Sequence, residues 1–313
     1  MPQPTQSPTI TIVGPTAVGK TAVSIALAKR MHTEIISADS RQIYRYMDIG
    51  TAKPTPEEQA AVRHHLIDLI DPDEVFSAGA YVREVQKVLA GWQEEDTPPL
   101  IAGGAGLYIR ALTGGLFEAP EIPEEVRERI RSDMEEVATN ILHDRLSKVD
   151  PEAAARIHPN DRQRIGRALE IYEATGTPLT TWHQTASPDP PPMNIRMIGL
   201  QRDRAELYAR TDARVDSMLE MGLINEVRRL LDMGYTADTV ALKTFGYAEI
   251  VAHLQGDLSL EEAIAQIKQQ TRRYAKRQMT WFRHAGPITW FTLSPESDVD
   301  RVCDEILAAH NIA

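Results

Sequence analysis

The residues GPTAVGKT, Gly14 to Thr21, fit the pattern G-x-x-x-x-G-K-[ST] at every fixed position. The apolar run Thr9–Val13 leads into them, and the alanine-rich helical pattern of Ala22–Met31 follows. Between a strand and a helix such a loop curls its backbone N–H groups around an anion, the lysine adds a positive charge, and the threonine hydroxyl suits Mg²⁺. The flanking elements favour this interpretation over an ordinary turn. We predict a polyphosphate-binding loop made of Gly14, Pro15, Thr16, Ala17, Val18, Gly19, Lys20 and Thr21.

The rest of the first third alternates strand and helix patterns. Glu34–Ser37 reads as a second strand, Ala80–Trp92 as a helix, and Leu100–Ala102 as a buried strand that enters the glycine-rich stretch Gly103–Gly106. This alternation is typical of a parallel sheet with helices on both faces. We therefore predict an α/β fold with the loop at the carboxyl ends of the strands.

Beyond Pro120 the pattern becomes helical only, as far as Ala174, and Gly176–Pro178 ends it. The proline-rich stretch Ala186–Pro192 reads as a stiff linker. Ile195–Leu200 then reads as another strand, followed by helices to the end. The simplest account is a core of residues 1–118 and 190–313 that carries the loop, interrupted by an all-helical insertion and linker at 119–189.

The composition narrows the class of protein. With one cysteine, Cys303, there is no internal disulfide framework and no CxxC zinc site, and a reducing compartment is indicated. The N-terminal residues resemble no secretion signal, and no apolar stretch approaches the roughly 20 residues of a membrane helix. We expect a cytoplasmic protein with no membrane partner, and nothing demands more than a monomer.

The net charge of −11 argues against a nucleic-acid partner, but basic residues gather in two places. Ala263–Pro295 contains no Asp or Glu, and Tyr274, Trp281 and Phe282 stand among its basic residues Lys268, Arg272, Arg273, Lys276, Arg277 and Arg283. The second group is Arg156, Arg162, Arg164 and Arg167. Such groups are either solvated helix faces or patches that bind a polyanion, and both interpretations stay open.

Six other positions are candidates for chemistry. Asp39 follows the second strand, so it could ligate Mg²⁺, accept a proton as general base, or cap the next helix. Arg210 and Arg214 share a helix face and could clamp a diphosphate or pair with Asp203 and Glu206. Lys53 reads as solvated surface. His64 and His65 are adjacent and point in different directions, which makes a metal pair improbable.

At these motifs the chain resembles the tRNA dimethylallyltransferase family, also called tRNA isopentenyltransferases. The loop motif occurs in many folds, whereas IHPND (157–161) and YAKRQMTWFR (274–283) are much more specific. The matching stretches run in family order over nearly the whole chain: GPTAVGKT (14–21), DSRQIY (39–44), GTAKP (50–54), HHLID (64–68), GGAGLY (103–108), DPEAAARIHPNDRQRIGRALE (150–170), GLINEV (222–227) and TRRYAKRQMTWFR (271–283).

The resemblance implies a reaction. A dimethylallyl group would pass from dimethylallyl diphosphate to the exocyclic amine (N6) of the adenosine 3′ of the anticodon, in tRNAs that read codons beginning with U, with release of diphosphate. The partners implied are the anticodon stem-loop of tRNA and the prenyl donor. An adenine in that loop must be extruded from its stack to reach a buried site.

The resemblance also implies roles for particular residues. Asp39 would be the general base, and Thr21 and Arg214 would act with it as catalytic residues. The loop residues 14–21, Thr16 among them, and Arg214 would bind the donor, with Mg²⁺ as cofactor at Thr21. The tRNA contacts would be Asp39, Ser40, Arg41, Gln42, Arg127, Gln163, Arg164, Ile165, Gly166, Arg167, Arg272, Arg273, Lys276 and Arg277, with the helical insertion as the tRNA-binding domain.

The chain departs from the family pattern at Ala105, where the family usually has threonine, so any hydroxyl contact from that side chain is absent. Three other classes of protein remain as alternatives. A small-molecule kinase explains the loop and Asp39 but not the basic groups, and a prenyltransferase for free adenine nucleotides has the same weakness. A non-enzymatic RNA-binding module leaves the loop without a purpose.

Overall fold

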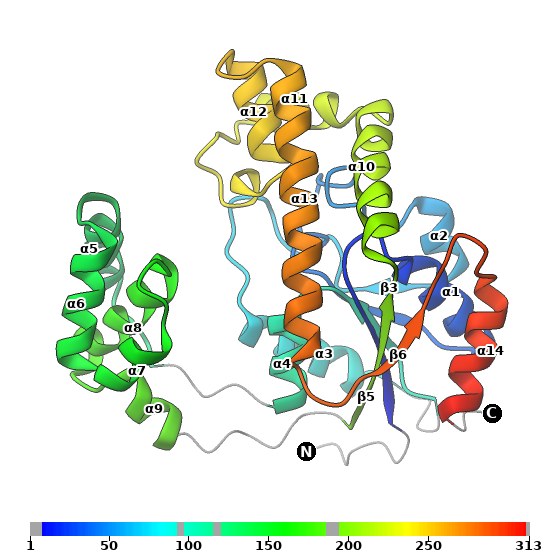
Figure 1. The fold of residues 1–313 in the computed structure, drawn as a ribbon, viewed down its shortest axis with the longest axis horizontal. Helices are drawn as coiled ribbons and strands as arrows, with labels where there is room; N and C mark the ends of the chain where they lie inside the picture. Colours follow the sequence, from blue (N-terminus) through cyan, green and yellow to red (C-terminus); the bar gives the residue numbers. More distant parts are fainter. Residues whose placement is uncertain (1–7, 93–96, 115–119, 186–193, 311–313) are drawn as a thin grey trace. The chain divides into compact units, whose positions relative to one another are not determined.

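A computed structural model describes residues 8–92, 97–114, 120–185 and 194–310 (Figure 1). The chain forms two compact units, which are treated separately below. The first unit is Met1–Thr113 together with Pro192–Ala313, and the second is Gly114–Pro191. The first unit contains all the described β-strands, while the second contains only helices among its described residues.

A six-stranded sheet forms the centre of the first unit, with the strand order β3-β2-β4-β1-β5-β6. Every neighbouring pair is parallel, which confirms the predicted α/β class. The strands are β1 (Thr9–Val13), β2 (Ile35–Ala38), β3 (His64–His65), β4 (Leu100–Gly103), β5 (Ile195–Gln201) and β6 (Thr289–Thr292).

The strand β1 lies near the middle of the sheet because its sequence TITIV suits burial on both faces. All five of its residues are buried, and β-branched side chains of this kind pack well on a pleated surface. It pairs with β4 on one side and with β5 on the other. The sheet is therefore completed by a strand that follows the second unit in the sequence.

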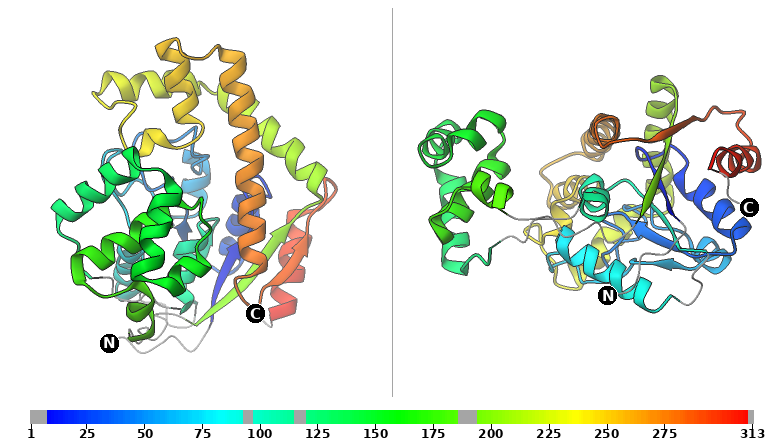
Figure 2. Two further views of the ribbon diagram at one scale, coloured as in Figure 1. Left: turned by 60° about the vertical axis from the view of Figure 1, so that its left-hand side comes forward. Right: turned by 90° about the horizontal axis from the view of Figure 1, so that it is seen from below.

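Helices cover both faces of the sheet (Figure 2). The helices α1 (Lys20–Arg30) and α14 (Val299–His310) pack together on one face. On the other face lie α3 (Ala78–Ala90), α4 (Gly106–Gly114) and the lower part of α13 (Leu260–Arg283). The apolar core around β1 and α1 includes Ile12, Leu27 and Ile198, each fully buried.

Beyond the carboxyl edge of the sheet, a helical layer belongs to the same unit. It contains α10 (Arg204–Glu220), α11 (Leu223–Asp232), the short 3₁₀ turn Ala241–Lys243 and α12 (Tyr247–Gln255), around a second apolar cluster. The helix α13 begins in this layer at a Ser259–Glu262 capping box and is 24 residues long, so it spans about 36 Å. It connects the helical layer to the sheet.

The second unit consists of α5 (Glu124–Glu136), α6 (Thr139–Val149), α7 (Pro151–Arg156), α8 (Arg162–Thr175) and α9 (Leu179–Thr185). Its own apolar core contains Ile130, Leu146 and Ile171. Asp150 links α7 to α9. Its carboxylate caps α7 by accepting a hydrogen bond from Ala153 N (2.9 Å), and it accepts another from Thr180 N (2.9 Å) in α9. Gly176, with φ +69°, ends α8 in the left-handed conformation.

The structure differs from the sequence predictions at four short elements. The strands β3 and β6 and the helices α2 (Pro56–Ala61) and α9 were not predicted. The prediction of helices alone after Leu200 is wrong at β6, because its sequence TWFT has no clear apolar alternation. The proline-rich linker at 186–192 lies outside the described residues. No described helix is long and apolar enough to cross a membrane.

Candidate active site

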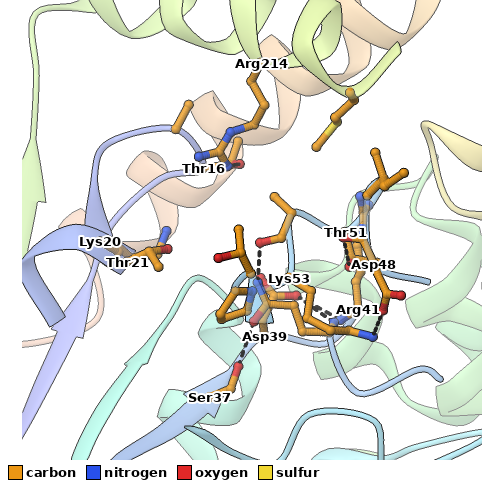
Figure 3. A pocket seen from close by; sticks show the side chains of 18 of the residues that line it. Thr16, Lys20, Thr21, Ser37, Asp39, Arg41, Asp48, Thr51, Lys53 and Arg214 are labelled. Carbon is orange, nitrogen blue, oxygen red and sulfur yellow. Dashed lines mark hydrogen bonds and ion pairs between the residues drawn. The ribbon is translucent and has the colours of Figure 1, made fainter. Parts of the chain in front are cut away.

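A cleft of about 740 Å³ opens at the carboxyl edge of the sheet, within the first unit (Figure 3). The predicted loop forms one wall with Thr16, Lys20 and Thr21, and Asp39 after β2 forms another. The helix α10 contributes Arg214, and α13 contributes Gln278. The three residues predicted to be catalytic, Asp39, Thr21 and Arg214, therefore line one cleft although they are far apart in sequence.

The loop holds its shape through unusual backbone angles. Gly14 has φ +149°, Gly19 has φ +116°, and Ala17 adopts a left-handed conformation at φ +63°. A Cβ atom at Gly14 would lie 2.6 Å from the carbonyl oxygen of Leu200, which belongs to β5. Glycine is thus required at position 14 both for its conformation and for the close approach of a neighbouring strand.

Backbone amides of the loop are available to an anion. The N–H groups of Ala17, Gly19, Lys20 and Thr21 donate to no other group in the described residues. The carbonyls, by contrast, are occupied by arginines: Arg202 Nε donates to Val18 O at 2.8 Å, and Arg210 Nε donates to Ala17 O at 2.9 Å. Because the free amides lie at the N-terminus of α1, the helix dipole also favours negative charge there.

Lys20 is folded back over the start of the loop. Its Nζ donates to Gly14 O at 3.0 Å and to Pro15 O at 2.9 Å. Burial lowers the pKa of Lys20 to about 8; the negative charge of Asp39 acts against this shift, and the positive charge of Arg214 adds to it. A bound diphosphate would favour the charged form of this lysine.

The two arginines on α10 reach the loop rather than the acidic residues near them. Arg214 Nη1 lies 3.2 Å from Thr16 Oγ1, and burial together with the charge of Arg210 lowers its pKa. Asp203 instead caps α10, and Glu206 pairs with Arg202. The alternative in which Arg210 and Arg214 pair with those two acids is therefore wrong.

Asp39 faces this group of cations from the other side of the cleft. Its Oδ1 accepts hydrogen bonds from Arg41 N (2.9 Å) and Gln42 N (3.4 Å), which orients the carboxylate. Its Oδ2 has no hydrogen-bond donor among the described residues, so one oxygen remains for a ligand. Asp39 does not cap a helix, because residues 40–43 form a turn and α2 begins only at Pro56.

Arg41 is held against two aromatic rings in the same cleft. Its guanidinium lies 3.7 Å from the ring centre of Phe245 and 5.0 Å from that of Tyr274. Gln42 is bonded to Ser37 and to Ala52 O (3.0 Å), whereas Ser40 is exposed. Three residues of the predicted segment Asp39–Gln42 thus line the cleft, namely Asp39, Arg41 and Gln42.

Two buried groups that support the cleft were missed or misread from the sequence. Glu226 is 3 % exposed, and its carboxylate accepts from the amides of residues 48, 49 and 50 and from Tyr247 Oη at 2.7 Å. The interpretation of Lys53 as solvated surface is wrong, because its side chain is buried and its Nζ binds Asp48 (2.6 Å) and Asp68 (2.5 Å). Both groups hold the segment that follows Asp39.

The basic run on α13 has two different faces. Lys268 pairs with Asp216 and Arg272 pairs with Asp212, so α10 supplies the acids that the run itself lacks. Arg272 therefore takes part in the contact between α13 and α10, and its role as an RNA contact stays a prediction. Arg273, Lys276 and Arg277 are exposed, and none has an acidic partner in the described residues.

The aromatic residues of the same run serve packing. Phe282 is 1 % exposed, and Trp281 packs on Gly106, where a Cβ atom would lie 2.4 Å from the indole. Tyr274 lines the cleft beside Arg41. Of the three aromatic residues that stand among the basic ones, Tyr274 is the one that lines the cleft.

Some of the predicted RNA contacts of the second unit are exposed and others are buried. Arg127, Gln163, Arg164 and Arg167 are exposed. Ile165 is fully buried, and a Cβ atom at Gly166 would lie 2.2 Å from Met134 Sδ. The assignment of these last two as RNA contacts is corrected accordingly, since they pack α8 onto α5. Arg162, in the second basic group, binds carbonyl oxygens at the end of α5.

Comparison with known proteins identifies the family of this chain. The family model described as IPP transferase matches residues 42–285. The chain belongs to the IPP transferase family. It is 48% identical over 301 residues to the tRNA dimethylallyltransferase of Symbiobacterium thermophilum, covering 96% of this chain and 94% of that one.

Solved structures of similar proteins share the fold. The full-length tRNA isopentenylpyrophosphate transferase of Bacillus halodurans has a TM-score of 0.70 at 41% identity, covering 98% of this chain and 97% of that one. A eukaryotic dimethylallyltransferase acting on tRNA has a TM-score of 0.81 at 26% identity, covering 97% and 78% of the two chains. The IPP transferase match begins at residue 42, so the roles of the loop and Asp39 rest on the geometry above.

Proposed function

We propose that this protein transfers a dimethylallyl group from dimethylallyl diphosphate to N6 of the adenosine 3′ of the anticodon in tRNAs that read codons beginning with U. The observation that carries the proposal is one cleft that holds an anion-binding loop, two cations and a carboxylate with a free oxygen. The name tRNA dimethylallyltransferase, carried by relatives of this length, supports the same reaction.

The donor diphosphate would occupy the loop. The amides of Ala17, Gly19, Lys20 and Thr21 donate to no other group in the described residues and would be free for the diphosphate. Lys20 and Arg214 line the same cleft and would supply positive charge. These donors are fixed before the substrate arrives, so they stabilise the charge that grows on the leaving diphosphate with little reorganisation.

The transfer is a displacement at C1 of the prenyl group. The N6 amine forms a bond to C1, the bond between C1 and the diphosphate oxygen breaks, and one N6 proton passes to Asp39. Asp39 Oδ1 is held by two amides, which leaves Oδ2 to accept that proton. Arg214 and Lys20 lie across the cleft from the carboxylate, on the side of the leaving group.

Mg²⁺ fits this site as a partner of the diphosphate. No group of three His, Cys, Asp or Glu side chains suited to a metal occurs among the described residues, so the protein offers few ligands of its own. Mg²⁺ at phosphate sites is commonly bound by one or two protein oxygens together with phosphate oxygens and water. Thr21 would hold the ion, whose charge would offset that of the diphosphate.

The tRNA would be bound by exposed basic side chains of both units. In the first unit these are Arg273, Lys276 and Arg277 on α13. In the second unit, which we propose as a tRNA-binding insertion, the candidates are Arg127, Gln163, Arg164 and Arg167. The cations on α13 have no acidic partner in the described residues and are free to neutralise phosphates. Arg127, Arg164 and Arg167 each make an exposed ion pair at i,i+3 spacing, which a phosphate would have to replace.

The test is transfer to unmodified tRNA. Purified protein, Mg²⁺ and dimethylallyl diphosphate should yield tRNA that carries one dimethylallyl group on the adenosine 3′ of the anticodon, as found by mass spectrometry of nuclease digests. Asp39→Asn keeps the size of the side chain but cannot accept the proton, so kcat should fall by about 10²–10⁴-fold. An unmodified tRNA, or phosphorylation of a small molecule by ATP, would contradict the proposal.

A further inference from the structure

Gln278 on α13 joins two glycine-containing loops that are far apart in the sequence. Its Oε1 accepts a hydrogen bond from Thr16 N at 2.8 Å, and its Nε2 donates to Gly104 O at 3.0 Å. The side chain is 6 % exposed, so neither bond has water as a ready substitute. A glutamine is suited to this position because its amide offers one acceptor and one donor.

The bond from Thr16 also changes which amides of the donor loop are available. Because the Thr16 N–H donates to Gln278, it is not among the free amides of the loop, unlike the N–H groups of Ala17 and Gly19. The side chain of the same residue contacts Arg214 at 3.2 Å. Thr16 is therefore held at its backbone by α13 and at its hydroxyl by α10.

Gly104 leaves the space that Gln278 occupies. A Cβ atom at position 104 would lie 2.2 Å from Gln278 Nε2, which is closer than side-chain atoms approach one another. The glycine-rich stretch after β4 thus presents the carbonyl of Gly104 to α13, where it receives the hydrogen bond from Gln278.

We infer that Gln278 is a positioning residue for the donor diphosphate, acting through Thr16. This inference rests on the proposed function, because it concerns the site assigned to the donor. Gln278 holds the first half of the loop in the shape that leaves the later amides open and brings the Thr16 hydroxyl to Arg214. Both polar atoms of its amide are taken by these two bonds, so it would act through Thr16 and not on the reacting atoms.

The first experiment replaces the side chain. Gln278→Ala removes both hydrogen bonds, and we expect the KM for dimethylallyl diphosphate to rise about tenfold, which corresponds to the loss of one to two ordinary hydrogen bonds. The KM for tRNA should stay within about twofold, because the RNA contacts proposed on α13 lie on its exposed face. Gln269→Ala, at an exposed position of the same helix, should change neither value.

The second experiment displaces Gln278 without replacing it. Gly104→Ala should push the amide away from Thr16 and raise the donor KM by about the same factor as Gln278→Ala. In the double variant the short side chain at position 278 leaves room for the new methyl group, so the effect should match that of either single variant. A double variant whose KM rises by the product of the two factors would show independent effects and overturn the inference.

A third measurement separates this inference from the proposed function. Binding of inorganic diphosphate with Mg²⁺, followed by calorimetry, requires no prenyl transfer. A wild-type protein that binds diphosphate but modifies no tRNA would contradict the proposed function alone. A variant at position 278 that keeps the wild-type diphosphate affinity would contradict the inference alone. So would a variant with a lower kcat, higher KM values for both substrates and lower thermal stability, since that pattern indicates only a structural role.

Discussion

At the scale of single residues, the cleft depends on charges that the fold brings together and partly removes from water. Lys20, Arg210 and Arg214 lie near one another in the cleft. Burial, and to a smaller extent the charge of a neighbouring arginine, lower the pKa of Lys20 and of Arg214. The folded protein thus maintains a region of positive charge that a diphosphate would neutralise.

This arrangement predicts a pH dependence of donor capture. Because the pKa of Lys20 is lowered to about 8, the lysine is charged below that pH and becomes neutral above it. We expect kcat/KM for dimethylallyl diphosphate to fall as the pH rises through about 8, since kcat/KM reports the ionisation of the free enzyme. The measurement is initial rates from pH 6 to pH 10 at constant ionic strength.

Lys20→Arg is the matched variant for that profile. An arginine stays charged throughout this range, so the alkaline fall should disappear even if the overall rate is lower. If the fall persists at the same pH in the variant, another group is responsible and the role given to Lys20 is wrong.

At the scale of elements, α13 has three functions along its 24 residues. One face is buried against the sheet and the helical layer through Ala275, Gln278 and Phe282. A second face meets α10 through the ion pairs of Lys268 and Arg272. The third face is exposed, and its cations have no acidic partner among the described residues. Only this face is therefore proposed to bind RNA.

The difference between these faces gives a prediction about salt. Each phosphate contact contributes about 0.7–0.9 to the slope of log K against log[salt]. Replacing Arg273 and Arg277 with glutamine should lower that slope for tRNA by about 1–2, because two cations without acidic partners are removed. Replacing Lys268 and Arg272 in the same way should change it less than half as much, because those cations already face Asp216 and Asp212.

Filter binding of tRNA from 50 to 300 mM salt would measure both slopes. Equal changes in the two double variants would mean that pairing with α10 does not decide which cations reach the RNA. Diphosphate binding serves as the control, since neither pair contacts the donor loop.

Local sequence was sufficient for elements whose pattern is complete within a few residues. The donor loop was predicted because its glycines, Lys20 and Thr21 are adjacent in the chain, and the strand before it is entirely apolar or β-branched. The buried state of Lys53 and the role of Glu226 could not be predicted, since their partners lie up to 15 and up to 178 residues away, respectively. The acids of α10 opposite Lys268 and Arg272 were missed for the same reason.

At the scale of the whole molecule, the chain is built from two units with separate apolar cores. The core of the second unit involves only helices α5 to α9 and the residues beside them. A defect confined to that core should therefore leave the donor site intact while weakening whatever the second unit contributes.

Leu146→Ala tests this separation. Leu146 is fully buried in the second unit, so the substitution should destabilise that unit by about 2–5 kcal/mol. Ile141→Ala, on the same helix but 55% exposed, should cost much less. Calorimetric unfolding would measure both, with inorganic diphosphate binding unchanged and tRNA affinity reduced for Leu146→Ala. Loss of diphosphate binding in that variant would contradict the separation.

The ribosome makes the strands of this sheet in an order that differs from their order in the sheet. The strand β1 is made first, yet its neighbour β5 begins at Ile195, after the whole second unit. At about 5–20 residues per second, roughly 10–40 s separate the two strands on the ribosome. During that interval β1 has an open edge, and open edges are where chains aggregate. Leu200 and Gln278 emerge later still, so the nascent chain completes its helical unit before the donor loop has either neighbour.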